Sequence, residues 1–324
     1  MSADKLKEKL KSIVEAPHSM QVYFVLKAEG QFTIKLADIE EENTAPELQR
    51  MFVGYIKNSL IENEELAVRD LSVADEQVGA VYRYDYESYP EELGIFKSFN
   101  ISEAVETEKF NFQIDDLSHL YGYIIYIGAM TEGIVLFKKH YHVSLIKRDS
   151  FLLGAIKSAE RFEKLPGEDI IRLNDSVQLL RVDDDIYVLD LKMLERNMGF
   201  SLLVEKAAED SIAAIENLGI VEDIQVLKDS LEITSFSRKL SKVKKTSPIF
   251  TLGITNTAII EFTKTTPELA GKFKYSENGM HIRLDTKKSK DAFLKLMNDA
   301  FLRSELTKQY YETSVKDKII PETA

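Results

Sequence analysis

The sequence of 324 residues contains no cysteine. The chain therefore cannot form disulfides, hold zinc through thiolates or use a cysteine nucleophile, and an intracellular setting fits. Glycine motifs that cradle phosphate are also missing, because neither a Walker-type loop nor a dinucleotide-binding fingerprint occurs. The Gly-x-Ser-x-Gly nucleophile elbow is absent as well. These absences favour a protein that works by binding rather than by chemistry.

Long apolar runs are equally scarce. The most apolar segment, residues 121–137, is interrupted by Thr131, Glu132 and Gly133. Neither half approaches the roughly 20 residues that a membrane-spanning helix needs. We interpret the segment as two buried strands joined by a turn. Residues 2–17 predict a charged amphipathic helix rather than an export signal, so we expect a cytoplasmic protein.

The composition is typical of a globular protein, with 44% apolar and 30% charged residues. Residues 22–26 and 79–86 have the apolar and aromatic character of strands, and residues 177–189 predict a hairpin. Patterns with a helical period dominate from about residue 191 onward. The sequence thus predicts an α+β fold. A mixed α/β N-terminal region with a central sheet covers residues 1–190, and a mainly helical, basic C-terminal region covers residues 191–324.

The net charge of −12 is distributed unevenly along the chain. Residues 235–324 contain 17 lysines and arginines against 10 aspartates and glutamates, a net charge of +7. Residues 1–234 carry the balance, −19. Such a split indicates an anion-binding end on an acidic body.

One basic cluster lies on a helix predicted over residues 236–245. Arg238, Lys242 and Lys245 share one side of this helix, opposite its apolar residues, so we expect all three to face water. No acidic residue occurs within residues 235–260 to pair with them locally. A polyanion along this side would supply the missing counter-charge.

A second basic cluster lies at the start of another helix, predicted over residues 289–303 with Ser289 as its cap, where backbone amides also favour anions. The alternative for both clusters is a solvated face without a ligand. We predict that they contact DNA phosphates, with strong salt dependence and weak sequence preference. The predicted contacts are Arg238, Lys242, Lys245, Lys287, Lys288 and Lys290. The next candidate group is Lys138, Lys139, Lys147 and Arg148.

A metal site at the paired histidines is not expected. His140 and His142 would point to the same side of an extended segment. However, no aspartate or glutamate lies within several residues of them, and zinc requires three or four ligands. We expect a basic surface strand here, with no bound metal or cofactor.

The clearest enzymatic hint is Asp190 followed by Lys192 at the end of an apolar strand. Some Mg²⁺-dependent nucleases place an acid and a lysine two residues apart on a strand, with a further acid upstream. Asp175 or Asp183 could supply that acid. The simpler interpretation is that Asp190 caps the helix that follows.

Three stretches of the sequence resemble a known family. They are residues 68–93, which include Val68-Arg-Asp-Leu-Ser72, residues 136–153, which include Leu136-Phe-Lys-Lys-His140, and residues 287–312, which include Lys287-Lys-Ser-Lys-Asp291 and Tyr310-Tyr-Glu312. Together they resemble the B component of the bacterial Kiwa antiphage defence system, the KwaB family. The resemblance runs over roughly residues 20–320.

The resemblance implies a cytoplasmic antiphage defence effector that binds DNA and has no catalytic triad or metal centre. It also implies association with itself and with the membrane-embedded Kiwa A component, which would hold it at the periphery of the inner membrane. Two alternatives stay open. One is a Mg²⁺-dependent nuclease that uses Asp190 and Lys192, and the other is a non-catalytic scaffold that senses the state of its membrane partner.

Overall fold

The computed structural model describes residues 2–16, 18–73, 80–104, 106–146, 153–156, 161–164, 170–304, 306–307 and 309–312. It confirms the predicted α+β fold, with a central sheet in the N-terminal half and mainly helices in the C-terminal part. The chain forms two compact units. The first comprises residues 1–68, 78–84 and 91–194, and the second comprises residues 69–77, 85–90 and 195–324. Two short upstream segments therefore belong to the second unit, which the sequence pattern did not predict.

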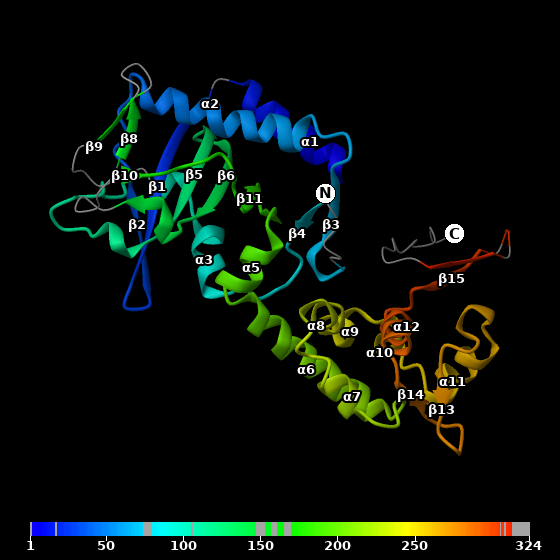
Figure 1. Cartoon of the computed structure of the whole chain (residues 1–324). Helices are drawn as coiled ribbons and strands as arrows, with labels where there is room; N and C mark the ends of the chain where they lie inside the picture. Colours follow the sequence, from blue (N-terminus) through cyan, green and yellow to red (C-terminus); the bar gives the residue numbers. More distant parts are fainter. Residues whose placement is uncertain are drawn as a thin grey trace. The chain divides into compact units, whose positions relative to one another are not determined.

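An eight-stranded sheet forms the centre of the first unit (Figure 1). Its strand order is β2-β1-β5-β6-β11-β12-β4-β3. The strands are β1 (Ser19–Ala28), β2 (Gln31–Leu36), β3 (Ala67–Asp70), β4 (Ala80–Arg83), β5 (Leu120–Ala129), β6 (Glu132–Lys139), β11 (Leu179–Val182) and β12 (Asp185–Val188). Antiparallel pairing of β5 with β6 confirms the interpretation of residues 121–137 as two strands. Pairing of β11 with β12 confirms the second predicted hairpin.

Helices cover both faces of this sheet (Figure 1). On one face lie α1 (Ala3–Glu15) and α2 (Thr44–Ile56), whose buried residues join the core under β5 and β6. On the other face lies α3 (Glu91–Ser98), whose Phe96 ring meets the Phe137 ring of β6 edge-on, with centroids 6.0 Å apart. The sheet is buried on both sides, which explains the continuous apolar runs in its central strands.

Further short elements lie along residues 57–197, of which η2 belongs to the second unit and α5 contains the division between the two units after Leu194. They are the π-helix η1 (Lys57–Ile61), the 3₁₀-helices η2 (Leu71–Val73, in a segment of the second unit), η3 (Leu117–His119) and η4 (His142–Ser144), the helices α4 (Ile101–Ala104) and α5 (Leu191–Asn197), and the strands β7 (Leu145–Ile146), β8 (Leu153–Ile156), β9 (Arg161–Lys164) and β10 (Ile170–Ile171). Two-stranded pairs form between β7 and β10 and between β8 and β9.

Two glycines hold the β5–β6 hairpin in register. A Cβ atom on Gly133 would lie 2.3 Å from the Tyr126 hydroxyl, and one on Gly128 would lie 2.4 Å from the Glu132 carbonyl oxygen. Since neither position has room for a side chain, glycine permits the close approach of the two strands. The resulting register sets Tyr123 opposite Lys138, the pair from which a cavity is built below.

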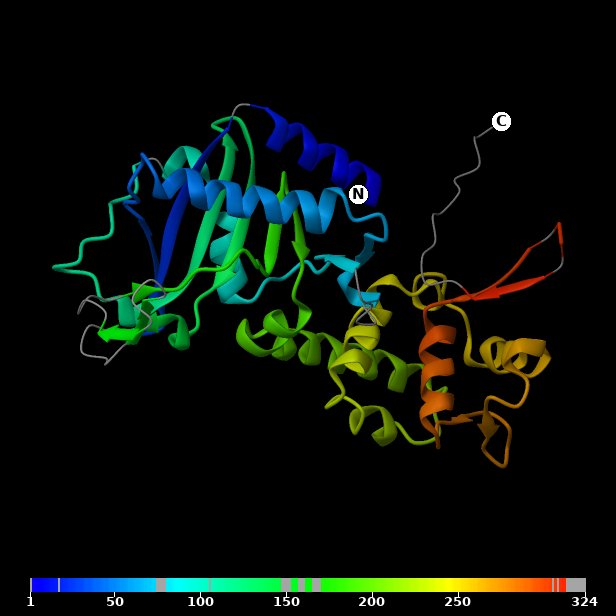
Figure 2. The ribbon, with the colours of Figure 1, turned by 45° about the horizontal axis from the view of Figure 1, so that its top comes forward.

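The second unit is mainly helical and appears in Figure 2 as the helices coloured from light green to orange. Its helices are α6 (Phe200–Leu218), α7 (Gln225–Lys228), α8 (Thr234–Ser241), α9 (Val243–Thr246), α10 (Pro248–Thr251), α11 (Asn256–Thr265), η6 (Pro267–Leu269) and α12 (Lys287–Met297). Two hairpins accompany them, β13 (Lys274–Tyr275) with β14 (Ile282–Arg283), and β15 (Phe301–Arg303) with β16 (Tyr310–Glu312). The buried faces of α6, α8, α11 and α12 share one apolar core.

The predicted helix over residues 289–303 is partly wrong. Helix α12 begins two residues earlier, with Thr286 rather than Ser289 as its cap, and the two residues form a reciprocal capping box. It ends at Met297, because Asp299 adopts the left-handed conformation with φ of 51°. Residues 301–303 instead form strand β15. Among the described residues, no helix combines the length and hydropathy needed to cross a bilayer.

Candidate functional site

Arg238 does not face water. Its side chain is only 1% exposed, and its Nε atom lies 3.2 Å from the Oε1 atom of Glu195, whose side chain is 13% exposed. The expectation that Arg238 presents its charge to solvent is therefore wrong. In this structure its guanidinium belongs to a buried ion pair of the second unit.

The other two members of this cluster are also paired. Lys242 donates to the carboxylate of Asp85 and, at 2.6 Å, to the Asp85 carbonyl oxygen, and its side chain is 21% exposed. Lys245 is 61% exposed and forms an ion pair with Glu87, whose pKa its ammonium lowers by hydrogen bonding. Solvent and salt screen an exposed pair of this kind, so a phosphate could compete for Lys245 but not readily for Lys242.

These pairs arise because acidic residues distant in sequence cover the second side of α8. The helical period showed one apolar side correctly, since Phe236 and Leu240 are buried. It could not show that residues 85–90 and Glu195 belong to the same compact unit. The chain also leaves the helix at Lys242, between α8 and α9. As a result α9 exposes Lys244, which was not among the predicted contacts.

The second predicted cluster, Lys287, Lys288 and Lys290, lies at the start of a helix as expected, but only two of its lysines are exposed. Lys287 and Lys288 are exposed in the first turn of α12. Within the described part of the chain, neither lysine forms an ion pair. Lys290 is half-buried, and its Nζ atom donates to the Ser230 hydroxyl at 2.8 Å. Among the described residues, Lys287 and Lys288 thus remain unpaired cations, whereas Lys290 is hydrogen-bonded within its own unit.

The residues of the nuclease hypothesis are not arranged as that chemistry requires. The Oδ1 atom of Asp190 accepts a hydrogen bond from the Met193 amide at 3.0 Å, which is the geometry of a helix cap. Lys192 lies exposed in the first turn of α5, not beside Asp190 on a strand. Asp183 pairs with Lys9 instead. Among the described residues, no group of three or more His, Asp or Glu side chains could hold a metal ion.

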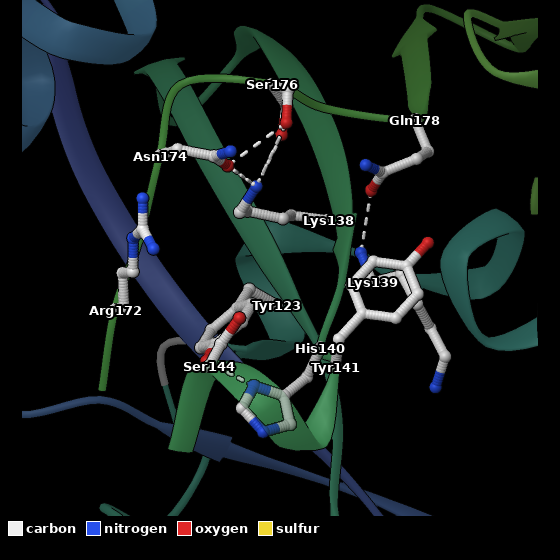
Figure 3. Close-up of a pocket in the computed structure, with 10 residues that line it drawn as sticks. All are labelled: Tyr123, Lys138, Lys139, His140, Tyr141, Ser144, Arg172, Asn174, Ser176 and Gln178. Atoms are coloured by element: carbon white, nitrogen blue, oxygen red, sulfur yellow. Dashed lines mark hydrogen bonds between the residues drawn. The ribbon is translucent and has the colours of Figure 1, made fainter. Parts of the chain in front are cut away.

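A cavity of about 290 Å³ lies in the first unit, beside the end of β6 (Figure 3). Its walls come from β5, from the end of β6 with the turn after it, and from the segment that leads into β11. The lining residues are Tyr123, Lys138, Lys139, His140, Tyr141, Ser144, Arg172, Asn174, Ser176 and Gln178. None of these ten residues is acidic, although the chain as a whole is.

Lys138 lies at the centre of this cavity wall (Figure 3). It is buried, and its ammonium donates to the Asn174 side-chain oxygen, to the Ser176 carbonyl oxygen at 2.6 Å and to the Ser176 hydroxyl at 3.4 Å. Burial lowers its pKa, which the charge of Asp175 partly offsets. Asp175 itself is exposed and does not line the cavity. Lys138 therefore brings positive charge into the wall and fixes residues 174–176.

His140 supplies an unusual buried group. Its ring is 4% exposed, and Nδ1 lies 2.8 Å from the Tyr123 hydroxyl. Its Nε2 atom is buried without a hydrogen-bond partner in the described structure. Burial, with smaller contributions from the charges of His142 and Lys139, lowers the pKa of His140 to about 4, so the ring is neutral near pH 7.

The next candidate group for DNA contacts was Lys138, Lys139, Lys147 and Arg148. The described part of the structure contains only the first two of these residues. Lys138 and Lys139 are neighbours on β6 and point to opposite faces. Lys139 donates to the Tyr121 carbonyl oxygen at 2.9 Å, and its Nζ atom lies 3.4 Å from the Tyr121 ring centroid. Burial lowers its pKa to about 8. Lys147 and Arg148 lie outside the described residues. Sequence reasoning missed Arg172, whose proximity to Lys138 depends on the tertiary fold.

The fold and these sites define an α+β protein whose candidate sites are cationic and lack a metal-ligand cluster in the described part. A sequence model of the family described as "Kiwa protein KwaB-like" matches residues 117–307, more than half of the chain. This range contains the cavity, α8 and α12. A curated relative, Kiwa protein KwaB of Escherichia coli O55:H7 (strain RM12579 / EPEC), is 28% identical, with 98% of this chain aligned to 99% of the relative. No solved structure matches.

The chain therefore belongs to the KwaB family, and the resemblance noted in the sequence is confirmed. It is a component of the Kiwa antiphage defence system.

Proposed function

We propose that this Kiwa component acts by binding DNA through the phosphate backbone. The observation that carries the proposal is the pair of exposed lysines, Lys287 and Lys288, at the start of α12. They lie in a segment, residues 235–324, with a net charge of +7. Because the remainder of the chain is acidic, binding depends on this local surface.

The first turn of α12 suits a phosphate for two reasons. Thr286 and Ser289 satisfy each other, so the backbone N–H groups of Lys287 and Lys288 have no partner among the described residues. Free N–H groups and the helix dipole favour an anion at this end of a helix. The two lysine side chains at the same turn add positive charge. Because neither forms an ion pair among the described residues, a phosphate need not displace a carboxylate from them. Contacts of this kind position a protein on DNA but carry little sequence information.

Lys245 is a second candidate contact, at the cost of its exposed ion pair with Glu87. Arg238 and Lys242 do not support the proposal, since their charges are already paired inside the unit. Replacing Arg238, Lys242 and Lys245 together by glutamate is consequently not a test of DNA binding. Such a variant would place a carboxylate beside buried Glu195 and disturb folding.

The matched test is the double variant Lys287→Ala with Lys288→Ala against a control that removes the same charge elsewhere. Lys5 and Lys206 are exposed helix lysines in the acidic part of the chain, so Lys5→Ala with Lys206→Ala is a suitable control. The assay is electrophoretic mobility shift with plasmid and short duplexes over a range of salt. We expect the α12 variant to lose affinity equally for all sequences.

The salt dependence gives the quantitative criterion. Each lost phosphate contact should reduce the slope of log affinity against log salt by about 1, hence by about 2 for the α12 variant. The control should leave the slope unchanged. If both double variants bind DNA as the parent does, α12 is not the contact surface.

Family membership also supports partner proposals. We propose that the chain associates with itself and with the membrane-embedded Kiwa A component, which places it at the periphery of the inner membrane. This rests on analogy within the family rather than on a surface of the molecule. Co-expression of both components, followed by purification through the A component, should recover this chain. A monomer at micromolar concentration that is not recovered with the A component would contradict the proposal.

A further inference from the structure

The cavity beside β6 presents free donors rather than free acceptors. The Arg172 guanidinium, the Ser144 hydroxyl and the Asn174 side-chain nitrogen line it, and none of them is engaged within the described part of the chain. The Asn174 oxygen is already used by Lys138 and Ser176. A ligand rich in acceptor oxygens would satisfy these groups.

His140 forms part of the same wall. Its Nδ1 atom lies 2.8 Å from the Tyr123 hydroxyl, so these two side chains hold each other in place. Its Nε2 atom is buried and has no hydrogen-bond partner among the described residues. Because that atom is buried, His140 shapes the wall of the cavity and does not itself bind a ligand there.

The charge of the wall selects the kind of anion. Lys138 has only neutral hydrogen-bond acceptors, and Arg172 has no carboxylate partner among the described residues. Two positive charges, with no carboxylate among the described residues that line the cavity, match an anion of charge near −2. A phosphate monoester carries about −1.5 to −2 at pH 7 and three acceptor oxygens, whereas a phosphodiester within a DNA strand carries one negative charge.

The size of the cavity limits the ligand. A volume of about 290 Å³ is at the lower end of the roughly 300–1,000 Å³ range of ligand pockets. It suits one small molecule or one strand end rather than a duplex. Tyr141 lines the cavity and is 44% exposed, so its ring is available to stack on a base.

We propose that this cavity binds a phosphate monoester carried by a nucleoside, either a free mononucleotide or the 5′-phosphate at the end of a DNA strand. Arg172 and Ser144 bind the phosphate oxygens, and the side-chain nitrogen of Asn174 lies in the same wall. Lys138 contributes charge and, through Asn174 and Ser176, holds the segment that carries Arg172. The site is separate from the lysines of α12 and does not depend on the proposed DNA surface.

Calorimetry of the full chain with thymidine 5′-monophosphate, thymidine and inorganic phosphate tests the free-nucleotide arm. We expect saturable binding of the monophosphate and none of thymidine. Arg172→Ala should weaken binding by about 10–100-fold, the loss typical of a charged hydrogen bond. Arg50→Ala removes an exposed arginine of the same unit that does not line the cavity, and it should bind as the parent does. Ser144→Ala is the second variant if Arg172→Ala fails to fold.

Single-stranded oligonucleotides with and without a 5′-phosphate test the strand-end arm, in the Lys287→Ala, Lys288→Ala background. We expect tighter binding of the phosphorylated strand, and Arg172→Ala should abolish the difference. Binding of the mononucleotide alone identifies the ligand as a free nucleotide, and a phosphate-dependent gain alone identifies a DNA end. The proposal is overturned if neither probe binds in a phosphate-dependent manner, or if Arg172→Ala binds both as Arg50→Ala does.

Discussion

Removing the guanidinium of Arg238 should destabilise the second unit strongly. Arg238→Met keeps most of the side-chain volume but removes the ion pair with the carboxylate of Glu195, which is 13% exposed. Removing one partner of a buried ion pair costs about 3–5 kcal/mol. Whole domains have a free energy of unfolding of only about 5–15 kcal/mol, so this variant should remain folded at room temperature with much reduced stability.

Urea unfolding followed by circular dichroism at 222 nm measures the loss. With a slope of about 1–3 kcal/mol per molar urea, the midpoint for the second unit should fall by at least 1 M. Lys245→Met is the matched control, because it breaks an ion pair whose side chains are 61% and 80% exposed. Because solvent screens such a pair, that change should shift the midpoint only slightly.

A double-mutant cycle with Glu195→Gln separates the ion pair from lost packing. The double variant Arg238→Met, Glu195→Gln should recover part of the stability lost in Arg238→Met, because the carboxylate that paired with Arg238 is then replaced by a neutral amide. The reasoning is refuted if Arg238→Met lowers the midpoint no more than Lys245→Met does. It is also refuted if the two single losses simply add.

Two further expectations follow from the first unit. The pKa of His140 is lowered from 6.5 to about 4, so the unfolded chain binds more protons and stability should fall as pH drops from about 6.5 to 4, by at most about 3 kcal/mol. In urea titrations from pH 4 to 7.5, His140→Gln should show a smaller fall than the parent, and an equal fall would contradict this assignment. We also expect plasmid DNA to remain uncut in Mg²⁺, because Asp190 caps α5 and Lys192 lies in its first turn; cleavage that Asp190→Ala abolishes would show the opposite.

Local patterns were sufficient for much of the fold. The run of apolar residues in 121–137, broken by Thr131-Glu-Gly133, predicted the β5–β6 hairpin because strand identity depends on neighbouring residues and on a turn signal. Helical periodicity likewise identified the buried side of α8. Patterns of this kind are set by the chain within about ten residues, so the sequence alone determined them.

Pairing of charges between distant segments was decided only by the tertiary structure. The residues 235–260 contain no acidic residue, yet Lys242 and Lys245 are paired, because residues 85–90 join the same unit. Helical periodicity identifies the apolar side of a helix. It does not show which distant residues contact the polar side of that helix. The helical spacing therefore supported the prediction that Arg238 faces water, but the prediction was wrong because Glu195 pairs with it in the folded unit.

The same distinction applies to the candidate sites, one of which could be predicted from the sequence and one of which could not. Lys287 and Lys288 were predictable as a basic cluster at the start of a helix, because the helical pattern that follows depends on adjacent residues, although the cap is Thr286 and not Ser289. The cavity was not predictable, because Arg172 and Lys138 line one cavity only when the segment before β11 passes the end of β6. Sequence by itself determined the elements, the charge asymmetry and the family of this protein. The fold decided which charges are neutralised and which remain free, because Coulomb energy and desolvation depend on distances in space and not on separation along the chain.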